Sequence, residues 1–151
     1  MSADPGTFAA VFAALFVAHS VGDHWVQTDA QAQAKGRPGW AGRWADTRHV
    51  ATLTITKLVL LLPAGLLLGL HLSVWGLAVG LGVDAVTHWW ADRRTTLARL
   101  AEVLGSGGFF RMGAPRPGCD DNPSLGTGAY ALDQSFHYLW LFIAALVIAA
   151  F

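Results

Sequence analysis

The chain has 151 residues, of which 54% are hydrophobic and only 13% are charged. The charged share is about half that of an ordinary soluble protein, which excludes a disordered chain and argues against a soluble globular enzyme. Ten Lys and Arg balance ten Asp and Glu, so the chain lacks the excess of basic residues that is typical of proteins that bind nucleic acid. The single cysteine, Cys119, excludes an internal disulfide framework.

Four long apolar stretches predict transmembrane helices at about residues 8–27, 50–70, 74–91 and 129–151. With a rise of about 1.5 Å per residue, each can cross or nearly cross a hydrocarbon core about 30 Å thick. The first stretch lacks a basic start, so we do not expect it to be a cleaved signal peptide. We predict an all-α integral membrane protein, a four-helix bundle that forms one domain over residues 1–151.

The connections between these stretches predict the topology. Residues 71–73 form a short turn, whereas residues 28–48 and 93–128 form long loops, so both long loops lie on the same side. That side has nine of the ten Lys and Arg residues, and the side with both termini and the short turn has none. The positive-inside rule therefore places the long loops in the cytoplasm and both termini outside the inner membrane.

The second long loop has two parts. Residues 94–104 have apolar side chains at helical spacing and predict a short amphipathic helix on the cytoplasmic surface. Residues 105–128 are rich in glycine and proline and predict a loop.

Two glycine pairs have GxxxG spacing, Gly65 with Gly69 in the second stretch and Gly76 with Gly80 in the third. They either let these two helices pack closely or reflect the frequency of glycine in membrane helices.

Three of the stretches have a histidine and an aspartate four residues apart, which places each pair on one helical face. A further histidine opens the second stretch, and the topology brings all seven residues to the cytoplasmic half of the bundle. An unpaired Asp at the centre of a membrane helix costs at least ~2.5 kcal/mol, so these side chains are expected to face one another around a cation. The seven residues are His19, Asp23, His49, His88, Asp92, Asp133 and His137.

Imidazole and carboxylate ligands favour a divalent transition metal, with zinc as the first choice and manganese or iron as alternatives. Seven candidates exceed the three or four protein ligands of one zinc ion, so one or two ions fit. Without a metal, the same residues would form a polar packing network or a proton relay. The predicted metal ligands are His19, Asp23, His88, Asp92 and His137.

Four residues are candidates for catalytic roles. Asp133 is a ligand or a general base, and His49 is a ligand or an acid. Gln27 extends the stripe of Asp23 in the first stretch, and Gln134 adjoins Asp133. Each either positions a substrate or is plain interfacial polarity.

Four more residues extend the candidate site. Asp84 lies deeper on the third stretch and is expected to support the ligands, while Lys57 pairs with Asp84 or snorkels to the surface. Arg93 and Arg94 follow Asp92 and are predicted to hold an anionic headgroup at the membrane surface.

The order of these polar residues resembles a family of small bacterial and phage membrane proteins, domain of unknown function 3307. The segments HSVGDHWVQ (19–27) and LDQSFH (132–137) are the most specific matches. The resemblance covers most of the chain, although the glycine- and proline-rich segment before the last stretch departs from it. It implies a membrane protein and no particular reaction. The pattern is also loosely similar to membrane-bound metal-dependent hydrolases with HxxxD helices, which is an analogy only.

These observations predict a metal-dependent hydrolase at the cytoplasmic membrane face. Its expected partner is membrane lipid, and its expected substrate is a phosphoester or amide of a lipid or amphiphile. One alternative is a metal or proton carrier or relay, which would need a homo-oligomer because four helices are few for a carrier. The other is an interaction protein in which the metal is structural.

Overall fold

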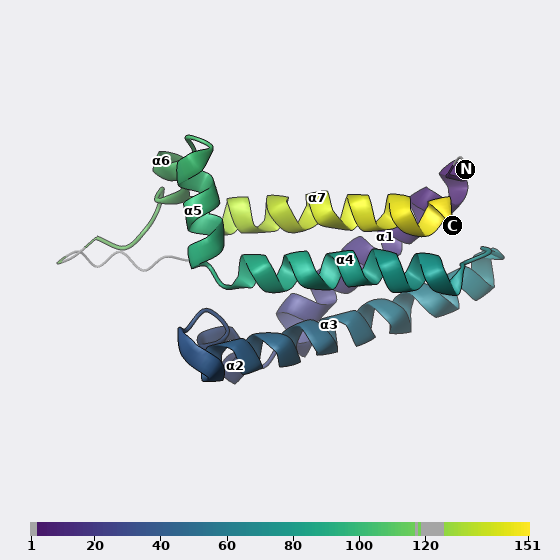
Figure 1. Ribbon diagram of the computed structural model, residues 1–151, viewed down its shortest axis with the longest axis horizontal. Coiled ribbons are helices and arrows are strands. Elements are labelled where there is room, and N and C mark those ends of the chain that lie inside the picture. The colour runs from purple at the N-terminus through teal and green to yellow at the C-terminus, as the bar shows by residue number, and fades with distance from the viewer. Residues whose placement is uncertain (1–2, 117, 119–125) are drawn as a thin grey trace.

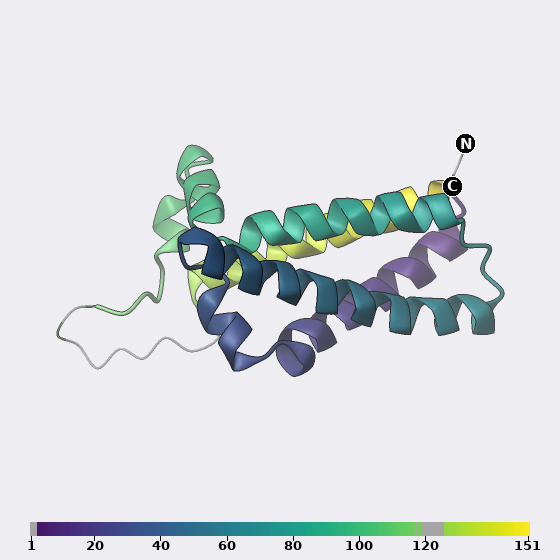
Figure 2. The same cartoon turned by 60° about the horizontal axis from the view of Figure 1, so that its bottom comes forward.

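The protein is described here by a computed structural model that covers residues 3–116, 118 and 126–151. Within these residues every regular element is a helix, and four long helices lie side by side (Figure 1, Figure 2). The long helices are α1 (Pro5–Val21), α3 (Gly39–Leu68), α4 (Val74–Asp92) and α7 (Gly128–Ala150).

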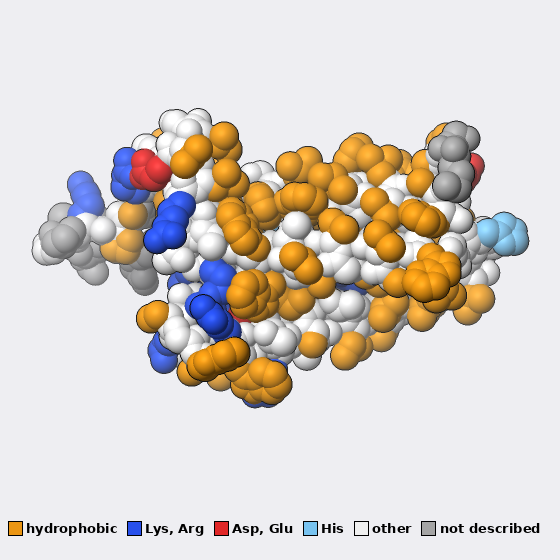
Figure 3. All heavy atoms as spheres, in the orientation of Figure 1, with side chains coloured by type: hydrophobic (Ala, Val, Ile, Leu, Met, Phe, Trp, Pro, Cys, Tyr) orange, Lys and Arg blue, Asp and Glu red, His pale blue; other side chains and the backbone are white. Residues whose placement is uncertain are grey.

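The shorter helices gather at the end of the bundle that lies away from both termini (Figure 1). The turn between α3 and α4 lies at the other end, near the termini (Figure 2). Blue Lys and Arg side chains gather around the short helices, whereas orange apolar side chains cover the long ones (Figure 3). The short helices are α2 (Asp29–Ala34), α5 (Thr95–Val103) and α6 (Gly107–Phe110).

Three helical segments are long and apolar enough to cross a membrane, namely Pro5–Val26, Gly39–Leu68 and Gly128–Ala150. The third predicted span, now α4, is not among them. Asp84, His88 and Asp92 lower its hydropathy, and all three side chains are buried inside the bundle. A helix that contributes several polar residues to the interior thus has a lower hydropathy than the other long helices, although it lies beside them in the bundle.

Two predicted boundaries differ from the structure. The first span continues from α1 into a π-helix, η1 (Gly22–Val26), and α3 begins at Gly39 rather than near residue 50. Residues 28–48, predicted as a loop, are therefore largely helical, because α2 also lies within them. Hydropathy did not reveal the first turns of α3 because they bury a polar side chain, Asp46, instead of an apolar stripe.

The predicted amphipathic helix forms as α5, with Leu97 and Ala101 buried. The predicted loop 105–128 contains the short helix α6, and its residues 117 and 119–125 lie outside the described part.

Side-chain caps account for several helix starts. The hydroxyls of Ser73 and Thr127 accept hydrogen bonds from backbone N–H groups in the first turns of α4 and α7.

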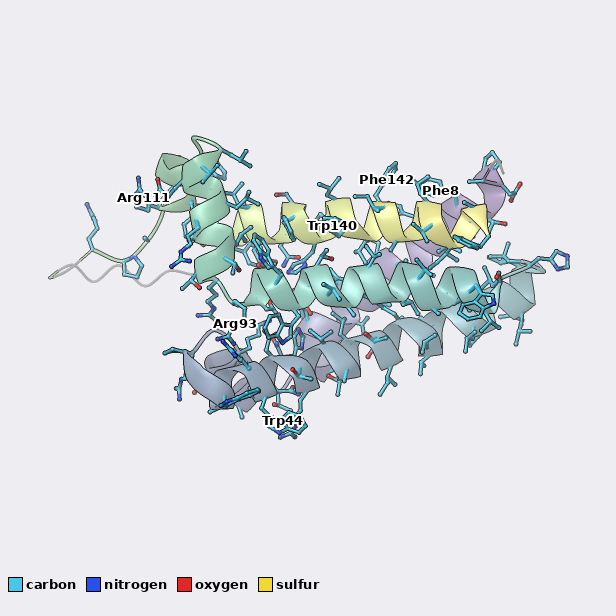
Figure 4. The ribbon with its side chains drawn as sticks, in the orientation of Figure 1. Phe8, Trp44, Arg93, Arg111, Trp140 and Phe142 are labelled. Atoms are coloured by element: carbon cyan, nitrogen blue, oxygen red, sulfur yellow. The ribbon has the colours of Figure 1, made fainter. Side chains whose placement is uncertain are left out.

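The bundle is apolar in the half that contains the termini and polar in the other half. Leu15, Leu61, Leu81, Leu141 and Ile148 form most of one buried cluster near the termini. Phe8 and Phe142 pack edge to face at the same end (Figure 4). All the buried polar side chains considered below lie farther along the helices, so the fold confines the candidate site to the half next to the short helices.

Candidate metal centre

Four histidines, one from each long helix, meet in the polar half of the bundle. The side chains of His19, His49, His88 and His137 are almost completely buried. The rings of His88 and His137 stack with centroids 4.0 Å apart, and His19 and His49 lie 5.4 and 5.2 Å from His88. The predicted convergence of the helical pairs is therefore present in the structure.

Two histidines and two aspartates point ligand atoms at one another. The Nε2 atoms of His49 and His88 lie 3.1 Å apart. Asp23 Oδ1 lies 3.3 Å and 3.8 Å from these two nitrogens, and Asp92 Oδ2 lies 3.4 Å and 3.3 Å from them. The four atoms thus form two triangles that share the His49–His88 edge.

The spacing matches the preferences of a small divalent ion. A tetrahedral ion with bonds of about 2.0–2.1 Å sets its ligand atoms about 3.3–3.4 Å apart. Each triangle is close to one face of such a tetrahedron. His49, predicted as a ligand or an acid, therefore lies at the centre of the candidate ligand set together with Asp23, His88 and Asp92.

His137 and His19 lie beside this set. His88, Asp92 and His137 form a second group whose ligand atoms are within 4.8 Å of one another. His137 Nε2 is 3.6 Å from Asp133 Oδ1, and His19 Nε2 is 3.6 Å from Asp23 Oδ2. Each of the two groups has ligand atoms close enough to hold a metal ion.

Several buried nitrogen and oxygen atoms in this cluster have no hydrogen-bond partner. Both ring nitrogens of His19, Nε2 of His137 and Oδ1 of Asp23 are among them. A buried polar atom without a partner costs about 1–3 kcal/mol, so unpaired atoms that converge from several helices are typical of a binding site.

Lys35, which sequence reasoning missed, contacts the cluster directly. It caps the C-terminus of α2, is mostly buried, and places its Nζ 2.9 Å from Asp92 Oδ2. No periodic pattern marks a lysine in a connection, so only the folded chain shows this contact.

Asp46 was also missed. It is fully buried on α3, neither carboxylate oxygen has a hydrogen-bond partner, and Arg93 Nη1 lies 3.9 Å away. Its spacing of three residues from His49 would have placed it on the same face if α3 had been predicted to start earlier.

The two arginines after Asp92 have different positions. Arg93 points from the end of α4 toward the start of α3 and donates to the backbone carbonyls of Lys35 and Arg37 (Figure 4). It is therefore engaged in holding the α2–α3 connection and does not line the cavity described below. Arg94 lines that cavity, and its Nη2 donates to the carbonyl of Ala32 at 3.2 Å.

Asp84 and Lys57 form a pair deeper in the bundle. Lys57 is completely buried and its Nζ donates to Asp84 Oδ2 at 2.5 Å. Of the two predictions for Lys57, the structure therefore shows the ion pair with Asp84.

A cavity of about 560 Å³ opens beside the cluster. Its polar wall includes Asp23, Asp92, Asp133, Gln27 and Gln134, so the three predicted catalytic residues other than His49 lie at its surface. Its apolar wall includes Leu97, Phe110 and Tyr130, which come from α5, α6 and α7. The cavity therefore gives a molecule with polar and apolar parts a route to the metal-type ligands.

The fold and the cluster define a helical protein with membrane-type helices and a His/Asp centre. A family model described as "Protein of unknown function (DUF3307)" matches residues 11–151. The match covers nearly the whole chain, so the protein belongs to this family. Neither the curated proteins nor the solved structures include a match to the chain.

Proposed function

We propose that this protein is a membrane-embedded metal-binding protein and a metal-dependent hydrolase that acts on a phosphoester or amide of a lipid or amphiphile. The observation that carries the proposal is the convergence of His49 and His88 nitrogens with Asp23 and Asp92 oxygens at 3.1–3.8 Å. Zinc suits this donor set best, and manganese or iron would also bind it.

A divalent metal held by these residues would lower the pKa of a water molecule toward neutrality, which is the chemistry that makes water a nucleophile at neutral pH. Asp133 lies at the cavity, partly exposed, where it can take a proton from that water or from the substrate. Gln27 and Gln134 would orient the substrate from the same wall, and His19 and His137 would complete or support the ligand set.

We also propose that α4 is a fourth span, that both termini lie outside the inner membrane and that the cavity faces the cytoplasm. The Lys57–Asp84 pair supports the first point, because each charge removes much of the cost of burying the other. The basic residues around the short helices support the orientation.

A metal or proton relay is the second candidate, because Lys57 and Asp84 extend the polar path deeper into the bundle. Beyond this pair the buried cluster is apolar and includes Leu15, Leu61, Leu81 and Leu141, so the described residues offer no polar route toward the termini. A homo-oligomer would be needed to supply one. A structural metal is the third candidate, and it predicts that metal removal unfolds the protein.

The first test is metal content, measured by elemental mass spectrometry on detergent-purified protein. We expect near-stoichiometric zinc, manganese or iron in the wild type and its loss in Asp92→Ala and His137→Ala. His71→Ala is the matched control, because this exposed histidine lies in the turn between α3 and α4, at the opposite end of the bundle. A metal-free wild type after metal-replete purification would refute the metal centre.

A positive result leads to a screen of phosphoester and amide substrates with wild type and Asp133→Ala. We expect the variant to keep its metal and to lose about 10²–10⁴-fold in turnover, the usual contribution of a positioned acid or base. Unchanged turnover in Asp133→Ala would show that this carboxylate is not the base.

A further inference from the structure

Lys35 is held in place by Arg93, the residue that follows the candidate ligand Asp92. Its backbone carbonyl accepts a hydrogen bond from Arg93, the neighbour of Asp92 along the chain. Its side chain then returns to Asp92, with 2.9 Å between Nζ and Oδ2. The backbone and the ammonium of Lys35 are thus both tied to the end of α4.

The oxygen that Lys35 contacts is the one that the histidines face. Asp92 Oδ2 lies 3.4 Å from His49 Nε2 and 3.3 Å from His88 Nε2. A divalent ion bound by this oxygen and these nitrogens would lie close to the ammonium. Two cations so close in a buried site repel each other strongly. The ammonium and the ion therefore compete for Asp92 Oδ2.

The cavity offers the Lys35 side chain a position away from Asp92, because Lys35 and Arg94 both line it. The backbone of Arg94 has φ of +57°, the one positive φ among the described residues other than glycine. Such a conformation costs about 1–3 kcal/mol and is found mainly at functional sites. Here it joins α4 to α5, and both Arg94 and Lys35 line the cavity.

The formal charge of the cavity depends on the metal. Lys35 and Arg94 supply two positive charges, and Asp23, Asp92 and Asp133 supply three negative ones, a net charge of −1. A bound divalent ion changes this to +1, so a metal-loaded cavity suits an anion. Leu97, Phe110 and Tyr130 give the same cavity an apolar wall for a hydrocarbon chain.

We infer that a divalent metal and the Lys35 ammonium are alternative partners of Asp92, so that metal binding frees Lys35 to hold, with Arg94, the phosphate of an anionic amphiphile. This inference rests on the proposed function and assigns its substrate class as an amphiphile with a phosphate headgroup. It also gives Lys35 a role that differs between the metal-free and the metal-bound protein.

The first test is zinc affinity of the full-length protein in detergent, for wild type, Lys35→Met and Arg99→Met. Methionine keeps the length of the lysine side chain without its charge, and Arg99 is an exposed residue of α5 that does not line the cavity. We expect Lys35→Met to bind zinc about tenfold more tightly than wild type, and Arg99→Met to match wild type.

Equal or weaker zinc binding by a folded Lys35→Met would overturn the competition between Lys35 and the metal. Absence of zinc binding from every variant would instead refute the metal centre itself. The two failures are therefore distinguishable.

The second test is calorimetric binding of dodecyl phosphate and of inorganic phosphate to zinc-loaded and zinc-free protein in dodecyl maltoside. We expect dodecyl phosphate to bind the zinc-loaded wild type about tenfold more tightly than either the zinc-free protein or zinc-loaded Lys35→Met. Lys35→Arg should keep most of the affinity because it keeps the charge.

Dodecyl phosphate binding that is independent of zinc or of Lys35 would overturn the inference. Inorganic phosphate binding as tightly as dodecyl phosphate would assign the site to a free anion and overturn the amphiphile. Dodecyltrimethylammonium has the same chain and the opposite charge, so its binding as tightly as dodecyl phosphate would overturn the role of the anion.

Discussion

Lys57 shows how a single charged residue can be kept inside a membrane-type helix. It is completely buried on α3, and its ammonium contacts only one charged partner at hydrogen-bonding distance, Asp84 on α4, among the described residues. Removing one member of such a pair leaves an uncompensated buried charge, which typically costs about 3–5 kcal/mol, whereas replacing both members by apolar groups is often close to neutral.

We therefore predict that Lys57→Met and Asp84→Leu each lower the free energy of unfolding in mixed micelles by about 3–5 kcal/mol. The double variant should lose much less than the sum of the two. Arg99→Met, an exposed charge, should change stability little. Additive losses in the double variant would show that the two side chains do not stabilise each other.

At the scale of helices, α4 packs most extensively against α7, and two glycines explain the close approach. A Cβ at Gly80 would lie 2.9 Å from the backbone carbonyl of Ala144 and 2.6 Å from Ile148, and a Cβ at Gly76 would lie 3.1 Å from the carbonyl of Ile148. The GxxxG pair in this helix therefore faces α7. Of the two interpretations given for this pair, close packing is the one observed, but the neighbour is α7 rather than the second span, because glycine spacing marks a face and not its partner.

Gly80→Ala should destabilise the protein by about 1–3 kcal/mol, because the helices must move apart to admit the methyl group. Gly82→Ala is the matched control on the same helix, since nothing lies within 4 Å of its added Cβ. We expect the control to be neutral or more stable by up to about 1 kcal/mol, from helix propensity alone. Thermal unfolding in detergent measures both, and equal effects would contradict the tight α4–α7 contact.

At the scale of the whole molecule, the polar and apolar halves lie at opposite ends. The short helices and most basic residues lie at one end, and the termini lie at the other (Figure 1, Figure 3). Between these ends the surface exposes large apolar side chains, among them Ile55, Val59 and Leu62 on α3. Such a surface is typical of helices in contact with lipid.

The proposed orientation predicts which end an impermeant maleimide can reach in spheroplasts. In a Cys119→Ser background, His71→Cys should react in intact spheroplasts, and Ala114→Cys should react only after lysis. Both positions are exposed in the structure, so burial does not explain a difference. The reverse pattern would invert the topology, and with it the cytoplasmic position of the cavity.

The helical class, the family and the residue types of the candidate site could be predicted from the sequence alone. The length of each hydrophobic stretch follows from the rise per residue of a helix, and the spacing of each His/Asp pair follows from its periodicity. Both are properties of a single helix and can be read from the local sequence. Periodicity therefore predicts that His19, His88 and His137 lie at one depth.

Which atoms meet depends instead on the packing of the helices. The 3.1 Å approach of His49 to His88, the contact of Lys35 with Asp92 and the engagement of Arg93 with the α2–α3 connection each join residues far apart in the chain. Such contacts depend on how the helices rotate and how the connections fold back. Periodicity along a single helix has no information about either.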